Sequence, residues 1–103
     1  MEIVVQSHHA AVSERTVQRA RRAVAAFGEA HGELVDATIR FEKDNPHRRV
    51  ELVIRATRRR TYVAEGTARF YGPALNQALT RIEAQILERL GRTRARARKL
   101  AKA

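Results

Sequence analysis

Two stretches of alternating apolar and polar residues, 35–42 and 50–57, constrain the fold of this chain more than any other feature. The apolar positions are Val35, Ala37, Ile39 and Phe41 in the first stretch and Val50, Leu52, Ile54 and Ala56 in the second. Side chains of a strand alternate between its faces, so each stretch predicts a strand with one buried and one solvent-facing side. Between them lie turn-forming residues, Asp-Asn-Pro-His at 44–47. Together they predict an antiparallel hairpin.

Two shorter strands are expected on either side of this hairpin. Residues 2–6 alternate with Ile3 and Val5 on one face, which predicts a short first strand. Three consecutive arginines at 58–60 predict a turn after the hairpin, followed by a weaker strand over 61–69. Gly66 lies inside that strand, and we expect it to mark a bulge or a bend.

A first helix is predicted from Ser13, a good N-cap residue, to Phe27, with its end at Gly28. Its apolar stripe comprises Val17, Ala20, Val24 and Phe27. Three arginines, Arg15, Arg19 and Arg22, share another face, and Arg21 flanks the stripe. The helix should therefore present a basic ridge to solvent.

A last helix is predicted to open at Gly72-Pro73, because proline is tolerated in a first helical turn. Its buried stripe comprises Leu75, Ala78, Leu79, Ile82, Ile86 and Leu90. A polar, mostly basic face carries Arg81, Gln85, Arg89 and Arg92. Gly91 interrupts the pattern, so we expect the arginine-rich tail to be helical only when bound. The predicted order is β-α-β-β-β-α, an α+β domain over residues 1–91 followed by a basic tail over 92–103.

Length and composition exclude several classes of protein. A chain of 103 residues suits one compact core, and the absence of cysteine excludes disulfide frameworks and thiolate sites. No apolar run approaches the roughly 20 residues that cross a bilayer, and the N-terminus lacks the basic start of a signal peptide. We therefore expect a soluble, cytoplasmic protein.

The net charge of +10 indicates a polyanionic partner. Residues 92–103 hold six basic side chains and no acid, and the preceding residues hold 15 basic against 11 acidic side chains. Arginine outnumbers lysine 18 to 3, which suits bidentate phosphate contacts but is also what a GC-rich genome would encode. Nucleic acid is the favoured partner and a membrane is not expected.

Nothing in the sequence forms a catalytic pattern. The four histidines, His8, His9, His31 and His47, fall in predicted loops or turns without metal-ligand spacing. The five glycines form no phosphate loop, and Ser7 and Ser13 lack the surroundings of a nucleophile. We predict no enzyme activity, no metal, no cofactor and no small-molecule substrate.

Four basic runs instead predict binding to the phosphate backbone of a nucleic acid: one on each helix, one in a turn and one in the tail. The candidate residues are Arg15, Arg19, Arg22, Arg58, Arg59, Arg60, Arg81, Arg89, Arg92, Arg94, Arg96, Arg98 and Lys99. Among the aromatic residues, Tyr62, Phe70 and Tyr71 are expected to be exposed, but no strand carries an RNA-recognition-motif pattern. Recognition of shape and backbone is therefore the expected mode.

With these elements in order, residues 2–95 resemble the ribosome hibernation-promoting factor and ribosome-associated inhibitor family. Val12-Ser13-Glu14 resembles its first helix start, and residues 37–43 resemble its Val-x-Val-x-Val-Glu-Lys strand. Residues 62–66, Tyr-Val-Ala-Glu-Gly, are similar to its Ala-Glu-Gly segment, and residues 74–86 to its last helix. The order and spacing of these motifs carry the resemblance.

The sequence departs from this family at the start of the last helix. Members of the family usually have the sequence Asp-Met-Tyr-Ala-Ala-Ile-Asp at this point, whereas residues 69–76 are Arg-Phe-Tyr-Gly-Pro-Ala-Leu-Asn. The first acid is missing and Asn76 replaces the second, so contacts that depend on those acids are not expected in this chain. The chain also resembles the short form of the family, without its C-terminal dimerisation domain.

The resemblance implies a four-stranded sheet with two helices on one face, similar to a double-stranded-RNA-binding domain. It implies a monomer that docks on ribosomal RNA of the small ribosomal subunit, in the channel for messenger and transfer RNAs, and inhibits translation in stressed or stationary cells. It gives the RNA-binding role to Arg19, Arg22, Arg81, Arg89 and Arg92. The alternatives are a constitutive ribosome-associated protein and a general RNA- or DNA-binding chaperone.

Overall fold

The computed structural model describes residues 1–8 and 10–102, and the side chains of its last helix as far as Arg89. Its elements are β1 (Glu2–His8), α1 (Glu14–Ala30), β2 (Leu34–Asp44), β3 (His47–Ala56), β4 (Arg60–Ala68) and α2 (Tyr71–Lys102). This order confirms the predicted β-α-β-β-β-α sequence of elements.

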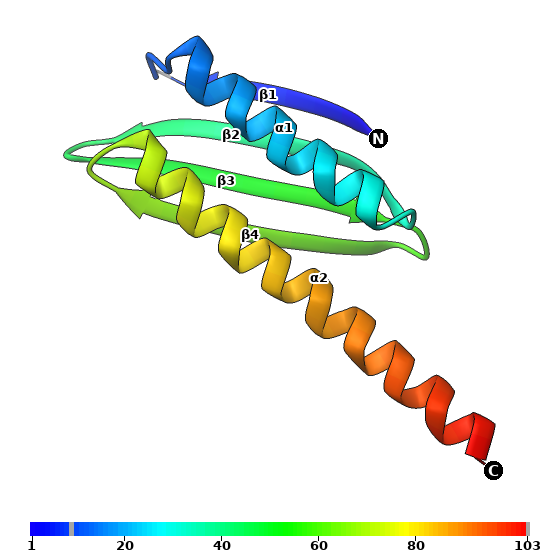
Figure 1. The fold of residues 1–103 in the computed structure, drawn as a ribbon. Helices are drawn as coiled ribbons and strands as arrows, with labels where there is room; N and C mark the ends of the chain where they lie inside the picture. The colour runs from blue at the N-terminus through cyan, green and yellow to red at the C-terminus, as the bar shows by residue number, and fades with distance from the viewer. Residues whose placement is uncertain (9, 103) are drawn as a thin grey trace.

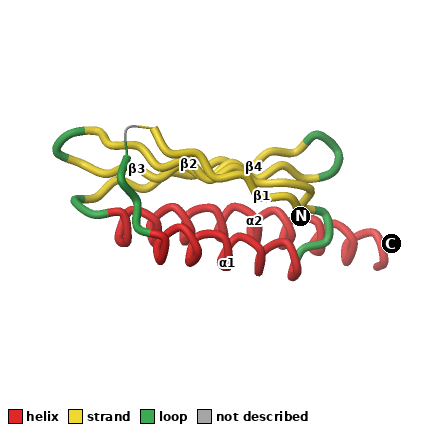
Figure 2. Tube along the Cα trace, turned by 90° about the horizontal axis from the view of Figure 1, so that it is seen from above, coloured by secondary structure: helices red, strands yellow, loops and turns green. Residues whose placement is uncertain are grey.

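The molecule has two layers, a four-stranded sheet and a pair of helices on one of its faces (Figures 1 and 2). The strands follow chain order, β1-β2-β3-β4. Strand β1 pairs in parallel with β2, because α1 carries the chain back across the sheet, whereas β2–β3 and β3–β4 are antiparallel. Helix α1 lies along β1 and β2, and α2 lies across β3 and β4 (Figure 1). Within the described residues, no helix covers the other face of the sheet, which we call the open face.

The central hairpin is confirmed, with one correction at its start. Ile39, Phe41 and Leu52 are fully buried under the helices, as the alternation predicted. Val35, however, is 49% exposed, and Leu34 is buried in its place. A register shift between Leu34 and Asp36 reverses the alternation at this point.

Helix α1 begins as predicted and ends later than predicted. The Ser13 hydroxyl accepts a hydrogen bond from the Thr16 amide at 3.2 Å, which satisfies one of the free donors of the first turn. The helix passes through Gly28 and ends at Ala30, where the His31 amide donates to the Phe27 carbonyl at 2.9 Å. Gly28 does not end the helix; its missing side chain leaves room for Met1, whose Cε would lie 3.0 Å from a Cβ there.

Helix α2 is continuous over 32 residues. Its predicted stripe is confirmed at Leu75, Ala78, Ile82 and Ile86, which are fully buried, and Leu79 is partly buried; the side chain of Leu90 lies outside the described residues. Gly91 does not interrupt the helix, so the prediction of a tail that is helical only when bound is wrong. Beyond the sheet the helix projects into solvent (Figure 1). The division of the chain at residue 91 stays a prediction.

Gly66 is neither a bulge nor a bend. Strand β4 pairs with β3 without a register shift, and Gly66 lies opposite Val50. A Cβ at Gly66 would stand 2.0 Å from the Ala74 carbonyl oxygen and 2.8 Å from the Gln77 Cβ. Glycine is present because the backbone of α2 crosses β4 at this point, and any side chain would hold the helix away.

Candidate nucleic-acid interface

Arginine side chains on the open face of the sheet are matched by carboxylates. Arg49 lies at the centre, with Nη1 2.9 Å from Glu42, Nη2 3.1 Å from Glu51 and Nε 2.9 Å from Glu65. Hydrogen bonds to Glu65, with smaller contributions from Glu42, raise the pKa of Arg49 above its ordinary value. Arg49 therefore donates charge-assisted hydrogen bonds to three carboxylates within the sheet.

Two more arginines on this face have acidic partners. Nη1 of Arg40 lies 3.8 Å from Glu42 and 3.9 Å from Glu51. Nε of Arg55 donates to Asp36 at 2.8 Å, and this hydrogen bond lowers the pKa of Asp36. The three arginines therefore face four carboxylates, and this cluster contributes none of the positive surplus of the chain. The surplus lies on other surfaces.

Helix α1 carries part of that surplus on its outer face. Arg15, Arg19 and Arg22 are exposed, at the spacing that places side chains on one face of a helix. None of the three forms an ion pair within residues 1–8 and 10–89. Arg21 is half-buried and donates to the Ile3 carbonyl at 3.3 Å, so it ties α1 to β1. The predicted basic ridge is present, with Arg21 outside it.

Arg19 is held by an uncharged partner on the other helix. Its guanidinium donates to the side-chain oxygen of Asn76, which links α1 to α2. An amide orients a guanidinium without cancelling its charge, whereas a carboxylate at the same position would form an ion pair. The departure at Asn76 therefore leaves Arg19 fixed and positively charged. The sequence alone reveals the missing acid but not that Arg19 would be its partner.

Part of the face of α2 that was predicted to bind RNA also covers the edge of β4. Gln77, Arg81 and Gln85, spaced by four residues, bond in turn to the Thr67 amide, the Glu65 carbonyl and the Val63 carbonyl of β4. The distances are 3.2, 2.7 and 2.8 Å. We call these three side chains the edge ladder. It satisfies backbone groups that an edge strand would otherwise offer to another chain.

The edge ladder changes the interpretation of Arg81. A substitution of Arg81 alters the attachment of α2 as well as the surface charge, so it does not isolate an RNA contact. Up to Arg89, α2 carries two arginines and two glutamates, Arg81, Arg89, Glu83 and Glu88, and so has no net charge. The remaining charge of α2 belongs to Arg92, Arg94, Arg96, Arg98, Lys99 and Lys102, whose side chains lie outside the described residues. The RNA-binding role of the first five stays a prediction.

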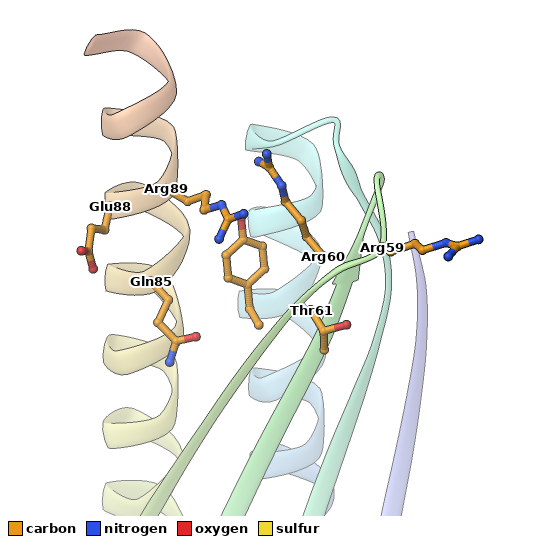
Figure 3. Close-up of a pocket in the computed structure, with 7 residues that line it drawn as sticks. Arg59, Arg60, Thr61, Gln85, Glu88 and Arg89 are labelled. Carbon is orange, nitrogen blue, oxygen red and sulfur yellow. The ribbon is translucent and has the colours of Figure 1, made fainter. Parts of the chain in front are cut away.

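Arginines also occupy the end of the β3–β4 hairpin. Arg58 and Arg59 are exposed and Arg60 begins β4. Arg89 of α2 lies across a groove from Arg59 and Arg60 (Figure 3). The backbones of Arg58 and Arg59 have positive φ angles, 62° and 58°. This conformation costs an L-residue about 1 kcal/mol, and glycine or asparagine is the usual choice.

The remaining candidates are the histidines and the aromatic residues. His8 ends β1, His31 caps α1 and His47 begins β3, so two of the predicted loop histidines lie in strands; His9 is outside the described residues. No group of three potential metal ligands occurs among the residues that the structure describes.

Of the three aromatic side chains expected at the surface, Tyr62 is 7% exposed, Tyr71 half-buried and Phe70 67% exposed. No helix in the described part of the chain is long and apolar enough to span a membrane.

These features define a class of small α+β module. Two helices lie on one face of a four-stranded sheet, and on the opposite face arginines are paired with carboxylates. A ribosomal subunit interface protein from Coxiella burnetii has this fold, with a TM-score of 0.79 at 12% identity over 88% of this chain and 99% of that one. The N-terminal domain of Protein Y from Thermus thermophilus is also similar, with a TM-score of 0.69 at 15% identity over 84% of this chain and 96% of that one.

No protein-family model matches the sequence, and a search of curated proteins finds no match. At these identities the two solved structures show a common fold. The predicted architecture and the resemblance that suggested it are therefore confirmed at the level of the fold.

Proposed function

We propose that this protein binds ribosomal RNA of the small ribosomal subunit in the channel for messenger and transfer RNAs and inhibits translation in stressed or stationary cells. The observation that carries this proposal is the fold match over 88% of the chain to a protein described as a ribosomal subunit interface protein. The distribution of charge supports it. The sheet face pairs its arginines, whereas α1 and the hairpin end present arginines that can contact phosphates.

In this role the protein binds and acts by occupying space. We assign the contacts to Arg15, Arg19 and Arg22 on α1, to the hairpin end and to the basic extension of α2. Such contacts read the shape and backbone of RNA, so binding should weaken steeply as salt rises. We expect a cytoplasmic monomer that needs no metal or cofactor.

The test is co-sedimentation with small subunits, comparing two variants that lower the net charge equally on different faces. Arg15→Gln with Arg22→Gln removes two positive charges from α1. Val4→Glu with Val63→Glu adds two negative charges to the open sheet face, where these valines are 42% and 50% exposed. We expect the first to weaken binding about ten- to hundred-fold, because each of the two lost guanidinium–phosphate interactions costs about 0.7–1.4 kcal/mol, and the second to bind nearly as the wild type does.

Equal weakening by both variants would show that net charge alone drives the association and would contradict the assignment to α1. Occupancy of ribosomes across growth phases separates the proposal from a constitutive ribosomal protein, because a translation inhibitor should accumulate on ribosomes as growth slows. Wild-type protein that binds duplex RNA as tightly as small subunits would instead indicate a general RNA-binding protein.

Asn76→Asp should weaken ribosome binding about three- to tenfold without loss of stability. The new carboxylate would pair with Arg19 and cancel a charge that contacts RNA. The slope of log affinity against log salt should become shallower by about one contact. Asn76→Ala is the matched control, because it removes the link between the helices but leaves Arg19 charged. An aspartate variant that binds as the wild type does would remove Arg19 from the interface.

A further inference from the structure

The end of the β3–β4 hairpin and α2 enclose a groove that the basic face of α1 does not share. The groove has a volume of about 460 Å³ (Figure 3). Its lining residues are Arg59, Arg60, Thr61, Tyr62, Gln85, Glu88 and Arg89. A second hollow of about 270 Å³ includes Arg60 and Arg89 and adds Arg58 and Glu33. Both hollows are therefore built around Arg60 and Arg89.

Side chains in this groove differ in direction. Arg60 from β4 and Arg89 from α2 extend toward the space between the hairpin and α2, whereas Arg59 points away from it (Figure 3). The four arginines of the two hollows face two acids, Glu33 and Glu88, which leaves a local positive charge. Thr61 adds a neutral hydrogen-bonding group to the walls, and so does Gln85, whose Nε2 also donates to the Val63 carbonyl. Guanidinium groups with neutral donors around an open groove fit the oxygens of a phosphate.

Backbone conformation is a second, independent observation. Arg58 and Arg59 hold positive φ angles, 62° and 58°, at the hairpin end. In turns of this kind asparagine and glycine relieve the steric conflict of a Cβ, yet the chain places arginine at both positions. Strained residues of this type persist where their side chains have a role. If this turn served folding alone, Asn-Gly in place of Arg58 and Arg59 would make the protein more stable.

We propose that this groove binds a phosphodiester of a nucleic-acid strand, and that Arg58 and Arg59 are retained, at the expense of stability, for contacts to the neighbouring phosphates of the same strand. The proposal rests on the proposed function in taking the strand to be ribosomal RNA. The strand would lie between the hairpin end and α2, with a phosphate between Arg60 and Arg89 and the neighbouring phosphates near Arg58 and Arg59. This site would add a contact to those of α1.

The deciding variant is Arg58→Asn with Arg59→Gly, which relieves the strain and removes two charges. We expect its melting temperature to rise by roughly 5 °C or more while its affinity for small subunits falls about tenfold. The slope of log affinity against log salt should become shallower by about two contacts. Arg60→Gln, at a position without positive φ, should weaken binding with no rise in melting temperature.

Lys43→Gln with Arg69→Gln is the matched control, since it removes two exposed charges at the opposite end of the strands. Its affinity should change less than twofold. An Asn-Gly variant that is more stable and binds small subunits with unchanged affinity and salt slope would overturn the proposal. So would a control that weakens binding as much as the Asn-Gly variant does.

A titration with sodium tripolyphosphate distinguishes a strand from a free polyanion. The amides of Thr61 and Gln85 report on the groove by their chemical shifts. For an RNA-strand site we expect small shifts that do not saturate at millimolar tripolyphosphate. Wild-type protein that saturates with tripolyphosphate but does not sediment with small subunits would refute the proposed function and identify the groove as a polyphosphate site.

Discussion

Gly66→Ala is expected to lower the free energy of unfolding by about 3 kcal/mol or more. The added Cβ would stand 2.0 Å from the Ala74 carbonyl oxygen, 2.8 Å from the Gln77 Cβ and 2.9 Å from the Ala78 nitrogen. Two of these atoms belong to the backbone of α2 and cannot rotate away, so the helix must move off β4. That movement opens the core around Leu75 and Ala78 and disrupts the edge ladder.

Chemical denaturation of Gly66→Ala beside Gly32→Ala measures this effect. No atom lies within 4 Å of a Cβ built at Gly32, and its φ is not positive. Gly32→Ala should therefore change the free energy of unfolding by less than about 0.5 kcal/mol. Equal stability of the two variants would mean that α2 does not cross β4 as closely as described.

Phe41→Ala should cost about 3–5 kcal/mol, a large share of the 5–15 kcal/mol that stabilises a typical domain. Phe41 is fully buried in β2. Its ring packs edge to face against the Tyr71 ring, with 5.7 Å between the two ring centroids. Its removal leaves a cavity between the sheet and the start of α2. Thermal and chemical denaturation give the cost, and Phe70→Ala, at a 67% exposed position, is the control with an expected change below about 0.5 kcal/mol.

Tyr71 gives a second measurement of the same packing. Burial raises the pKa of its phenol above the ordinary value of 10.0, although nearby Arg48 lowers it in part. Because the folded pKa is the higher one, the contribution of Tyr71 to stability is present below pH 10 and is lost as the pH rises through the folded pKa. In Phe41→Leu, which should stay folded, water reaches Tyr71 and an ultraviolet titration should give a lower pKa than in the wild type. An unchanged titration would show that Phe41 does not shield Tyr71.

Local patterns predicted the elements well because burial imposes a period on the sequence. The alternation through Ile39 and Leu52 and the helical spacing of Ile82 and Ile86 each follow from one face being buried. The errors lie where a contact distant in sequence decides the outcome. Gly28 looks like a helix end but accommodates Met1, and Gly66 looks like a bulge but accommodates α2.

The sequence predicts the positive charge of the candidate site, but it does not predict which arginines bond to other parts of the protein. Arg15 and Arg22 were found on an exposed face from spacing alone. Arg81 also lies outside the buried stripe of its own helix, yet it bonds to a backbone carbonyl of β4. No local signal distinguishes these two outcomes, because the difference arises from which strand lies beside the helix. The positive φ angles of Arg58 and Arg59 could not be predicted either, because arginine is a residue type that argues against that conformation.

The position of α2 sets the order in which the protein can form during its synthesis. Strand β1 is made first, but it pairs with residues 36–42, and the sheet beyond them is completed only at Ala68. Residues that close the core over that sheet, Leu75, Ala78, Ile82 and Ile86, are made later still. A nascent chain that ends before Leu75 therefore leaves the apolar faces of β3 and β4 and the edge of β4 open to water and to other chains. For this protein, closure of the core must wait until α2 has been translated.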